Sequence, residues 1–240
     1  MSKSLKLFLG ISYILILCAF LYLIFSYVEI KRLDDFLYYK ELQISLEKII
    51  SESFYKNLII FFFFSLIWVS LLGFGSPLLL VSGILFGKWI GTFISVLSVS
   101  IGALILYSIV NFFFKDLVNS LLGKKFSKYI YLFRKNEFNY FFAFRLTGGL
   151  GIPFGLQNIL PVIFNIKKLN YFFASFLGFI PIFFIWNTIG AGLNEYIKQA
   201  DNFNFMNLIL NKEIYLPIIL FVILMLISTI VKRKIFDERN

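Results

Sequence analysis

The sequence predicts an all-α integral membrane protein. Of its 240 residues, 60% are hydrophobic and only 15% are charged, whereas a globular domain carries about 25% charged residues. Several uncharged stretches reach the roughly 20 residues that a helix needs to cross about 30 Å of hydrocarbon. The net charge of +10 comes from basic residues in short segments between apolar runs. These residues indicate membrane topology and contact with lipid head groups, so no nucleic-acid partner is predicted.

Residues 1–56 are predicted to form an N-terminal transmembrane anchor and an interfacial helix. The run Leu7 to Val28 follows two lysines, as a signal peptide would, but it is longer than a signal-peptide core and lacks an Ala-x-Ala-like exit. The stretch Leu33 to Tyr55 has apolar residues near helical spacing with charges between them. This pattern is typical of an amphipathic helix that lies on the membrane surface.

Residues 57–194 are predicted to form the main membrane domain. Its first charge-free run, Asn57 to Gly87, has 31 residues, about 46 Å as one helix, which is too long for one upright span and too short for two. The run is broken at Gly73 to Pro77, where Ser76 can cap a helix and Pro77 suits its first turn. We therefore predict a re-entrant helical hairpin, followed by a transmembrane helix over Trp89 to Phe114.

A second hairpin is predicted over Leu146 to Ile166, because Gly148, Gly149, Gly151 and Pro153 break its first part. A transmembrane helix over Leu169 to Asn194 follows it. Residues 195–240 are predicted to hold a C-terminal transmembrane helix, Ile214 to Val231, and a basic tail.

The distribution of basic residues predicts the orientation. If both hairpins return to the side from which they entered, a cytoplasmic N-terminus places 14 basic residues in the cytoplasm and 8 outside. If Asn57 to Gly87 crossed fully, the most basic loop, Lys115 to Glu137, would lie outside. The sequence therefore predicts an inverted repeat of two oppositely oriented hairpins, each followed by a transmembrane helix, with both termini in the cytoplasm.

Arg145 is the first candidate for a functional residue. A guanidinium at membrane depth costs about 2.5 to 3.5 kcal/mol on insertion scales, so something must compensate its charge. One interpretation is that Arg145 binds an anionic group, such as the phosphate of a lipid, through two N–H groups. The other is that it reaches the cytoplasmic interface, since the apolar stretch before it is short.

The glycine-rich breaks are the second candidates. A tight reversal leaves backbone groups unpaired, which lipid does not tolerate unless they line a cavity or pack against protein. The cavity interpretation makes both breaks and the amides that follow the second one part of a substrate path. The structural interpretation makes them only packed hairpin turns. The residues concerned are Gly73, Gly75, Ser76, Pro77, Gly148, Gly149, Gly151, Pro153, Gln157 and Asn158.

Other glycines indicate close helix packing rather than a site. Gly83, Gly87 and Gly91 have four-residue spacing, with Gly102 further on, and the later helix contains Gly178, Pro181, Gly190 and Gly192.

Catalytic residue types are missing from the predicted membrane core. The chain has no histidine and one cysteine, Cys18, and no carboxylate lies between Lys56 and Phe114 or between Leu146 and Asn194. A metal site or a carboxylate pair for acid–base chemistry therefore has no ligands there. The sequence predicts no enzyme, no metal and no cofactor.

These segments resemble the VTT-domain superfamily, also called DedA-like or SNARE-associated Golgi proteins, and most resemble its Golgi-type branch. The resemblance covers roughly Asn57 to Asn194. It rests on Gly75-Ser76-Pro77, Gly83 to Gly87, Gly91, Gly102-Ala103, Phe144-Arg145-Leu146, Pro153-Phe154, Asn158, Gly178 and Pro181. It implies two opposed re-entrant hairpins, a role in moving lipids, and a functional arginine at Arg145.

The sequence thus predicts a multi-pass protein of the cell (inner) membrane that acts as a flippase or scramblase for a phosphate-bearing lipid. Its predicted partners are membrane lipids with anionic head groups. One alternative is a non-transporting membrane scaffold or assembly factor, in which the hairpins only pack. Another is a transporter of small ions or solutes, which the lack of core carboxylates disfavours.

Overall fold

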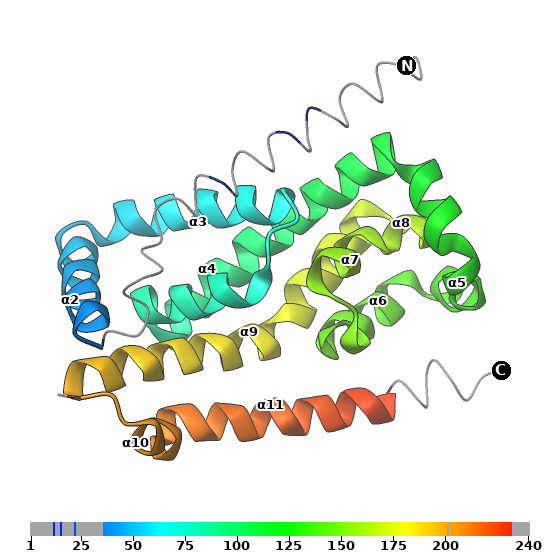
Figure 1. Ribbon diagram of the computed structural model, residues 1–240. Helices are drawn as coiled ribbons and strands as arrows, with labels where there is room; N and C mark the ends of the chain where they lie inside the picture. The colour runs from blue at the N-terminus through cyan, green and yellow to red at the C-terminus, as the bar shows by residue number, and fades with distance from the viewer. Residues whose placement is uncertain (1–11, 13–14, 16–21, 23–35, 201, 232–240) are drawn as a thin grey trace.

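The computed structural model describes residues 36–200 and 202–231, together with positions 12, 15 and 22. Within these ranges every regular element is a helix (Figure 1), which confirms the predicted all-α class. The predicted N-terminal transmembrane helix, apart from those three positions, and the basic tail lie outside the described residues. The helices are α2 (Phe36–Glu52), α3 (Phe54–Ser70), α4 (Gly75–Phe113), α5 (Lys115–Lys135), α6 (Glu137–Leu146), the 3₁₀ turn η2 (Gly148–Gly151), α7 (Phe154–Ile159), α8 (Pro161–Phe164), α9 (Lys168–Gln199), α10 (Phe205–Leu210) and α11 (Lys212–Val231).

Two of the described helices are long and apolar enough to cross a membrane. They are α4, with 39 residues, and α9, with 32 residues. A third span is reached if α2 and α3, which meet at a bend of 110°, count as one broken element. The chain is therefore a helical protein of the membrane type.

The break between α3 and α4 lies where the sequence predicts it, but its chemistry differs. Leu72, not a glycine, adopts the left-handed conformation (φ 65°), and the next N–H, of Gly73, donates to Trp68 O at 2.8 Å. A bond of this kind ends a helix by pairing one of its last carbonyls. Helix α4 then begins at Gly75 without a side-chain cap, so Ser76 lies inside the first turn and the predicted cap is wrong. Pro77 lies in that first turn, as predicted.

Gly87 divides α4 into two helical segments. Its φ of 72° and ψ of 178° are non-helical, and a Cβ added there would meet nothing within 4 Å. The prediction that Gly87 serves close helix packing is therefore wrong. Gly87 is used for its backbone freedom, because a side chain makes this conformation costly.

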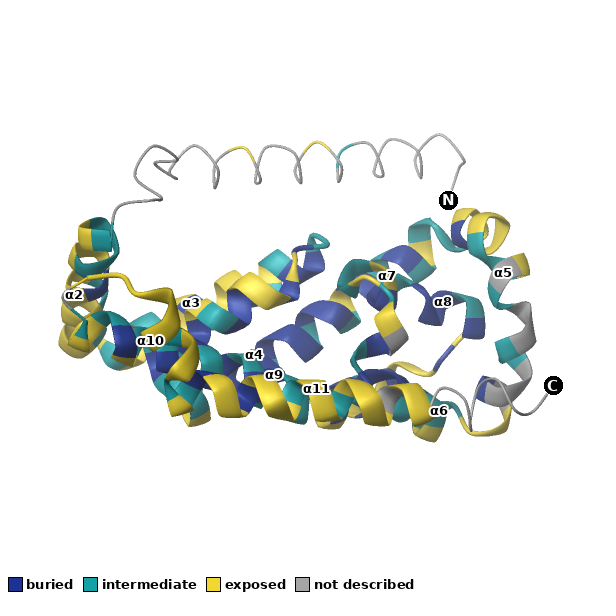
Figure 2. Cartoon of the chain, turned by 60° about the horizontal axis from the view of Figure 1, so that its bottom comes forward, coloured by how far each residue is buried: buried dark blue, intermediate teal, exposed yellow. Residues whose placement is uncertain are grey.

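The core forms where α4 crosses α9, and three of the predicted packing glycines, Gly83, Gly91 and Gly190, lie there. A Cβ on Gly83 would clash with Asn187 O, and one on Gly190 would clash with Leu80 O. Gly102 has the same role against α3, since a Cβ added there would lie 2.7 Å from Leu66 O. Figure 2 shows buried residues along α4 and α9 and exposed residues along the outer side of α11.

Between α5 and α9 the chain changes direction through short helical elements. The sequence predicts a second hairpin that begins at Leu146, whereas in the structure the helix before the glycines is α6, which ends at Leu146. After the glycines, two short helices replace one half-helix, and Asn165 in the left-handed conformation (φ 54°) ends the second of them. Helix α5 packs against α8 and α6 at the same end of the molecule (Figure 1).

We expect Gly190→Ala to destabilise the fold by about 1–3 kcal/mol, because the added methyl group pushes α9 away from the backbone of α4. The measurement is the thermal unfolding midpoint of the purified protein in detergent. Gly123→Ala is the matched control, since a Cβ there meets nothing within 4 Å. Equal melting of the two variants would contradict the close packing of α4 on α9.

Candidate functional site

The two glycine-rich breaks, far apart in the sequence, contact each other in the structure. A Cβ on Gly75, at the start of α4, would lie 3.5 Å from the ring of Phe154 at the start of α7. A Cβ on Gly155 would lie 3.3 Å from the side chain of Leu72, in the first break. The ends of the broken elements therefore meet inside the fold, next to Arg145.

Arg145 is fully buried near the end of α6. Its Nε donates to Ser175 Oγ at 3.1 Å, and its Nη2 donates to Asn158 Oδ1 at 2.7 Å and to Tyr171 OH at 2.9 Å. Its Nη1 donates to Gln157 Oε1 over a longer 3.4 Å. All four acceptors are uncharged, and they use four of the five N–H groups of a guanidinium. The Arg145 guanidinium is therefore bonded inside the protein, whereas the second interpretation placed it among lipid head groups.

Aromatic rings complete the shell around this guanidinium. Its central carbon lies 4.8 Å from the ring centre of Phe141, 4.7 Å from that of Phe179 and 5.5 Å from that of Tyr171. Gly178 lets α6 approach α9, because a Cβ there would lie 2.5 Å from Arg145 Cβ. The cation is held by π-faces and neutral dipoles, which leave its formal charge unbalanced.

Gln157 joins Arg145 to the glycine turn. Its Nε2 donates to Gly148 O at 3.1 Å and to Ile152 O at 2.6 Å, while its Oε1 faces Arg145. The amide lies directly over Gly149, whose φ is 75°. Gly149 therefore provides both a left-handed backbone and the room for Gln157.

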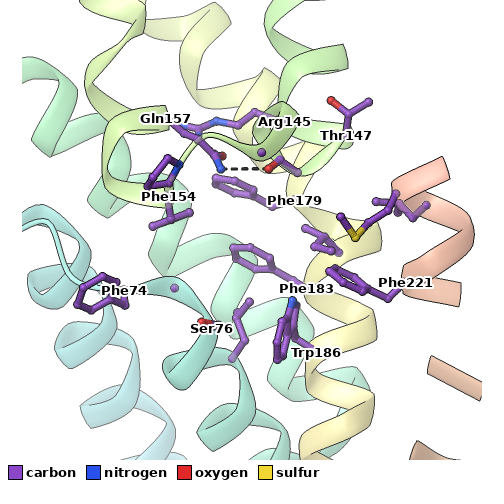
Figure 3. A pocket seen from close by; sticks show the side chains of 18 of the residues that line it. Phe74, Ser76, Arg145, Thr147, Phe154, Gln157, Phe179, Phe183, Trp186 and Phe221 are labelled. Carbon is purple, nitrogen blue, oxygen red and sulfur yellow. Dashed lines mark hydrogen bonds between the residues drawn. The ribbon is translucent and has the colours of Figure 1, made fainter. Parts of the chain in front are cut away.

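A cavity of about 580 Å³ opens beside these groups. Figure 3 shows Arg145, Gln157 and Thr147 at one end and Phe183, Trp186 and Phe221 toward the other, with Phe74 and Ser76 on a third side. One end of the cavity is thus polar and cationic, and the rest of the wall is largely aromatic and aliphatic. The first break, the second break, α9 and α11 all contribute to it.

The structure brings most of the predicted site residues to this cavity. Those that line it are Gly75, Ser76, Arg145, Gly148, Gly151, Pro153 and Gln157. The others lie behind the wall. Gly73 lies under the indole of Trp68, Gly149 lies under Gln157, and Asn158 is fully buried against Arg145. Pro77 belongs to the first turn of α4 and is not part of the lining.

Sequence reasoning missed the α9 side of the site. Tyr171, Ser175 and Phe179 all contact Arg145, and their spacing of four residues places them on one face of a helix. That periodicity, with Gly178 beside it, is a signal in the sequence. The α11 wall, formed by Phe221, Leu224, Met225 and Thr229, has no such signal, since nearly every residue of α11 is apolar.

Two further features bear on the chemistry of the site. Asn158 Nδ2 is buried without a hydrogen-bond partner, so a second donor beside Arg145 has no acceptor. In the part of the chain that the structure describes, no three His, Cys, Asp or Glu side chains form a group that could hold a metal ion. The site thus offers donors and positive charge for an anion.

Comparison with known proteins gives one match. The family model described as VTT domain matches residues 72–192, a segment that starts in the first break and ends in α9. No curated protein and no solved structure matches the chain.

We expect Gly149→Ala to destabilise the protein more than Gly148→Ala. Both glycines have positive φ, 75° and 67°, so both substitutions carry the same backbone cost of about 1–2 kcal/mol. Only at Gly149 does the added Cβ meet Gln157, whereas at Gly148 it meets nothing within 4 Å. Thermal unfolding in detergent compares the two, and equal destabilisation would show that Gln157 does not lie over Gly149.

Proposed function

Because the chain belongs to the VTT-domain family, we propose that it is a multi-pass membrane protein that moves a phosphate-bearing lipid between the two leaflets. In this proposal the protein is a flippase or scramblase rather than an enzyme. The cavity takes the lipid, and Arg145 binds the anionic head group. The observation that carries the proposal is a fully buried guanidinium, with only neutral acceptors, at the wall of that cavity.

The electrostatics of Arg145 favour an anionic ligand. A buried charge costs several kcal/mol when no opposite charge compensates it, and the four neutral acceptors compensate it only in part. The Nη1–Gln157 bond is long, at 3.4 Å, so a phosphate oxygen could replace Gln157 Oε1 with a shorter, charge-assisted bond. The buried Asn158 Nδ2 is a further donor next to the same group.

The remaining wall of the cavity suits the apolar part of an amphiphile. Phe179, Phe183, Trp186 and Phe221 line it, and aromatic and aliphatic side chains bind hydrocarbon without an unpaired polar group. A small inorganic ion would gain nothing from this part of the wall. The combination of one cationic end and an apolar body matches a lipid with a phosphate group.

The orientation in the membrane is part of the proposal. We propose a protein of the cell (inner) membrane in which α3 with the first segment of α4, and α6 with α7 and α8, are two re-entrant hairpins of an inverted repeat. The helix breaks at Leu72, Gly87 and the glycine turn support this arrangement. Both termini then face the cytoplasm, together with the basic helix α5.

A scaffold without transport is the second candidate. It is favoured by the bonds from Arg145 to α7 and α9, which would hold the second hairpin against the core whether or not a lipid binds. A transporter of small ions or solutes is a third candidate, and among the residues that the structure describes no carboxylate lines the cavity to support it.

Leaflet exchange decides between the first two candidates. We expect purified protein in liposomes to exchange a fluorescent phospholipid or a polyprenyl phosphate between leaflets, and Arg145→Ala to exchange it about 10- to 100-fold more slowly, since a charge-assisted bond is lost. Alanine retains the Cβ that packs on Gly178. Arg145→Lys, which keeps the charge but not the planar fork, should retain part of the activity.

Folding is checked by gel filtration and thermal unfolding of each variant before exchange is measured. Folded Arg145→Ala protein that exchanges lipid at the wild-type rate would give Arg145 a purely structural role. Absence of exchange in folded wild-type protein, for either lipid, would favour the scaffold.

Labelling of single cysteines tests the orientation. In a Cys18→Ser background, Ser120→Cys in α5 and Ser51→Cys in α2 place one exposed thiol each at the two predicted faces. We expect a membrane-impermeant maleimide added to intact cells to label Ser51→Cys and not Ser120→Cys. Labelling of both thiols would contradict the first hairpin and with it the inverted repeat, and the reverse pattern would contradict the proposed orientation.

A further inference from the structure

A second cavity, of about 520 Å³, lies at the other end of α6 from Arg145. Its walls come from the end of α5, the start of α6, the end of α8 and the start of α9. Glu137, the first residue of α6, lines it, whereas Arg145 is eight positions further along that helix. The two positions are therefore about 12 Å apart along the helix axis, at 1.5 Å per residue.

Positive charge dominates this second cavity. Lys135 and Lys167 line it, and both are exposed. Lys115 lies at its edge, because its Nζ donates to Asn165 Oδ1 at 3.1 Å and Asn165 is part of the lining. The surrounding segments, residues 115–137 and 167–168, hold eight basic and two acidic residues.

The one carboxylate of the lining does not neutralise these lysines. Glu137 Oε2 accepts from the backbone N–H of Lys167 at 3.0 Å, and its Oε1 accepts from Asn170 Nδ2 at 2.5 Å. Both oxygens are thus used to tie the start of α6 to the start of α9. Among the residues that the structure describes, Glu137 forms no ion pair with the ammonium group of Lys135 or of Lys167.

The rest of the lining is largely apolar. Phe133 and Phe164 stack in parallel with ring centres 4.0 Å apart, and Ile130, Phe138 and Ile163 lie in the same lining. A lining that combines ammonium groups and amides with stacked rings fits an amphiphile. Freely rotating ammonium groups bind phosphate as point charges.

We propose that this lysine cavity is a second phosphate-binding site, for the head group of an anionic phospholipid in the leaflet that α5 faces. The inference extends the proposed function, because it places the same kind of head group at a second point along α6. It does not require that lipid be moved, since binding at Lys135 and Lys167 involves neither Arg145 nor the first cavity. The site would load or retain anionic lipid beside the transport path.

The test is calorimetric binding to the purified full chain in a neutral detergent. The probes are dihexanoyl phosphatidic acid, dihexanoyl phosphatidylcholine and inorganic phosphate. We expect K135Q/K167Q to bind the phosphatidic acid at least about tenfold more weakly than wild type, because two charge-assisted contacts are lost. K56Q/K212Q removes the same charge from two exposed lysines outside this lining and should bind within about twofold of wild type.

Arg145→Ala separates this inference from the proposed function. We expect the folded variant to keep the lysine-dependent binding even where it loses leaflet exchange. Inorganic phosphate that binds as tightly as phosphatidic acid, with the same dependence on Lys135 and Lys167, would assign the site to soluble phosphate and overturn the lipid assignment. Wild-type affinity in K135Q/K167Q, or an equal loss in K56Q/K212Q, would overturn the site itself.

Discussion

The burial of the Arg145 guanidinium constrains the positions of the helices around it, because they must supply its hydrogen-bond acceptors. Removing a cation from water costs several kcal/mol unless its N–H groups and its charge are compensated. Here Ser175 and Tyr171 on α9 and Asn158 on α7 accept its hydrogen bonds, while three aromatic rings face it. The end of α6, the glycine turn, α7 and α9 are thereby held together, although three of these elements have ten residues or fewer.

The fold also requires the backbones of neighbouring helices to approach closely, and glycine residues at the helix crossings allow this. In lipid there is little hydrophobic drive to bring helices together, so packing depends on small residues at the crossings. Gly83 and Gly190 bring α4 against α9, and Gly178 brings α6 against α9. These contacts fix the distance between the two broken elements, and that distance allows Gly75 to contact Phe154 at the cavity wall.

The two cavities share a chemical character and differ in depth. The first contains a buried arginine and an aromatic wall, and the second contains exposed lysines and a pair of stacked rings. A buried arginine selects a ligand by geometry, because its fork is rigid and dry, whereas solvated lysines attract anions with little geometric demand. Under the two proposals, the exposed lysines of the second cavity would attract anionic lipid, and the buried arginine of the first cavity would select among the lipids that arrive.

The sequence by itself determined the helical class, the membrane character and the location of both breaks. Long apolar runs require a lipid environment, and glycine clusters interrupt helices, whatever tertiary contacts the segment makes. The sequence also singled out Arg145, because a charge in an apolar context is costly wherever the chain folds. It did not identify Leu72 as the left-handed residue or Gly87 as a backbone break, because several neighbouring residues could take either conformation locally. Only the tertiary structure decided that Tyr171 and Ser175 hold Arg145, that the two breaks meet, and that α11 lines the cavity. Those contacts join segments far apart in the chain, and the spacing of residues within one segment carries no information about which other segment will cover it.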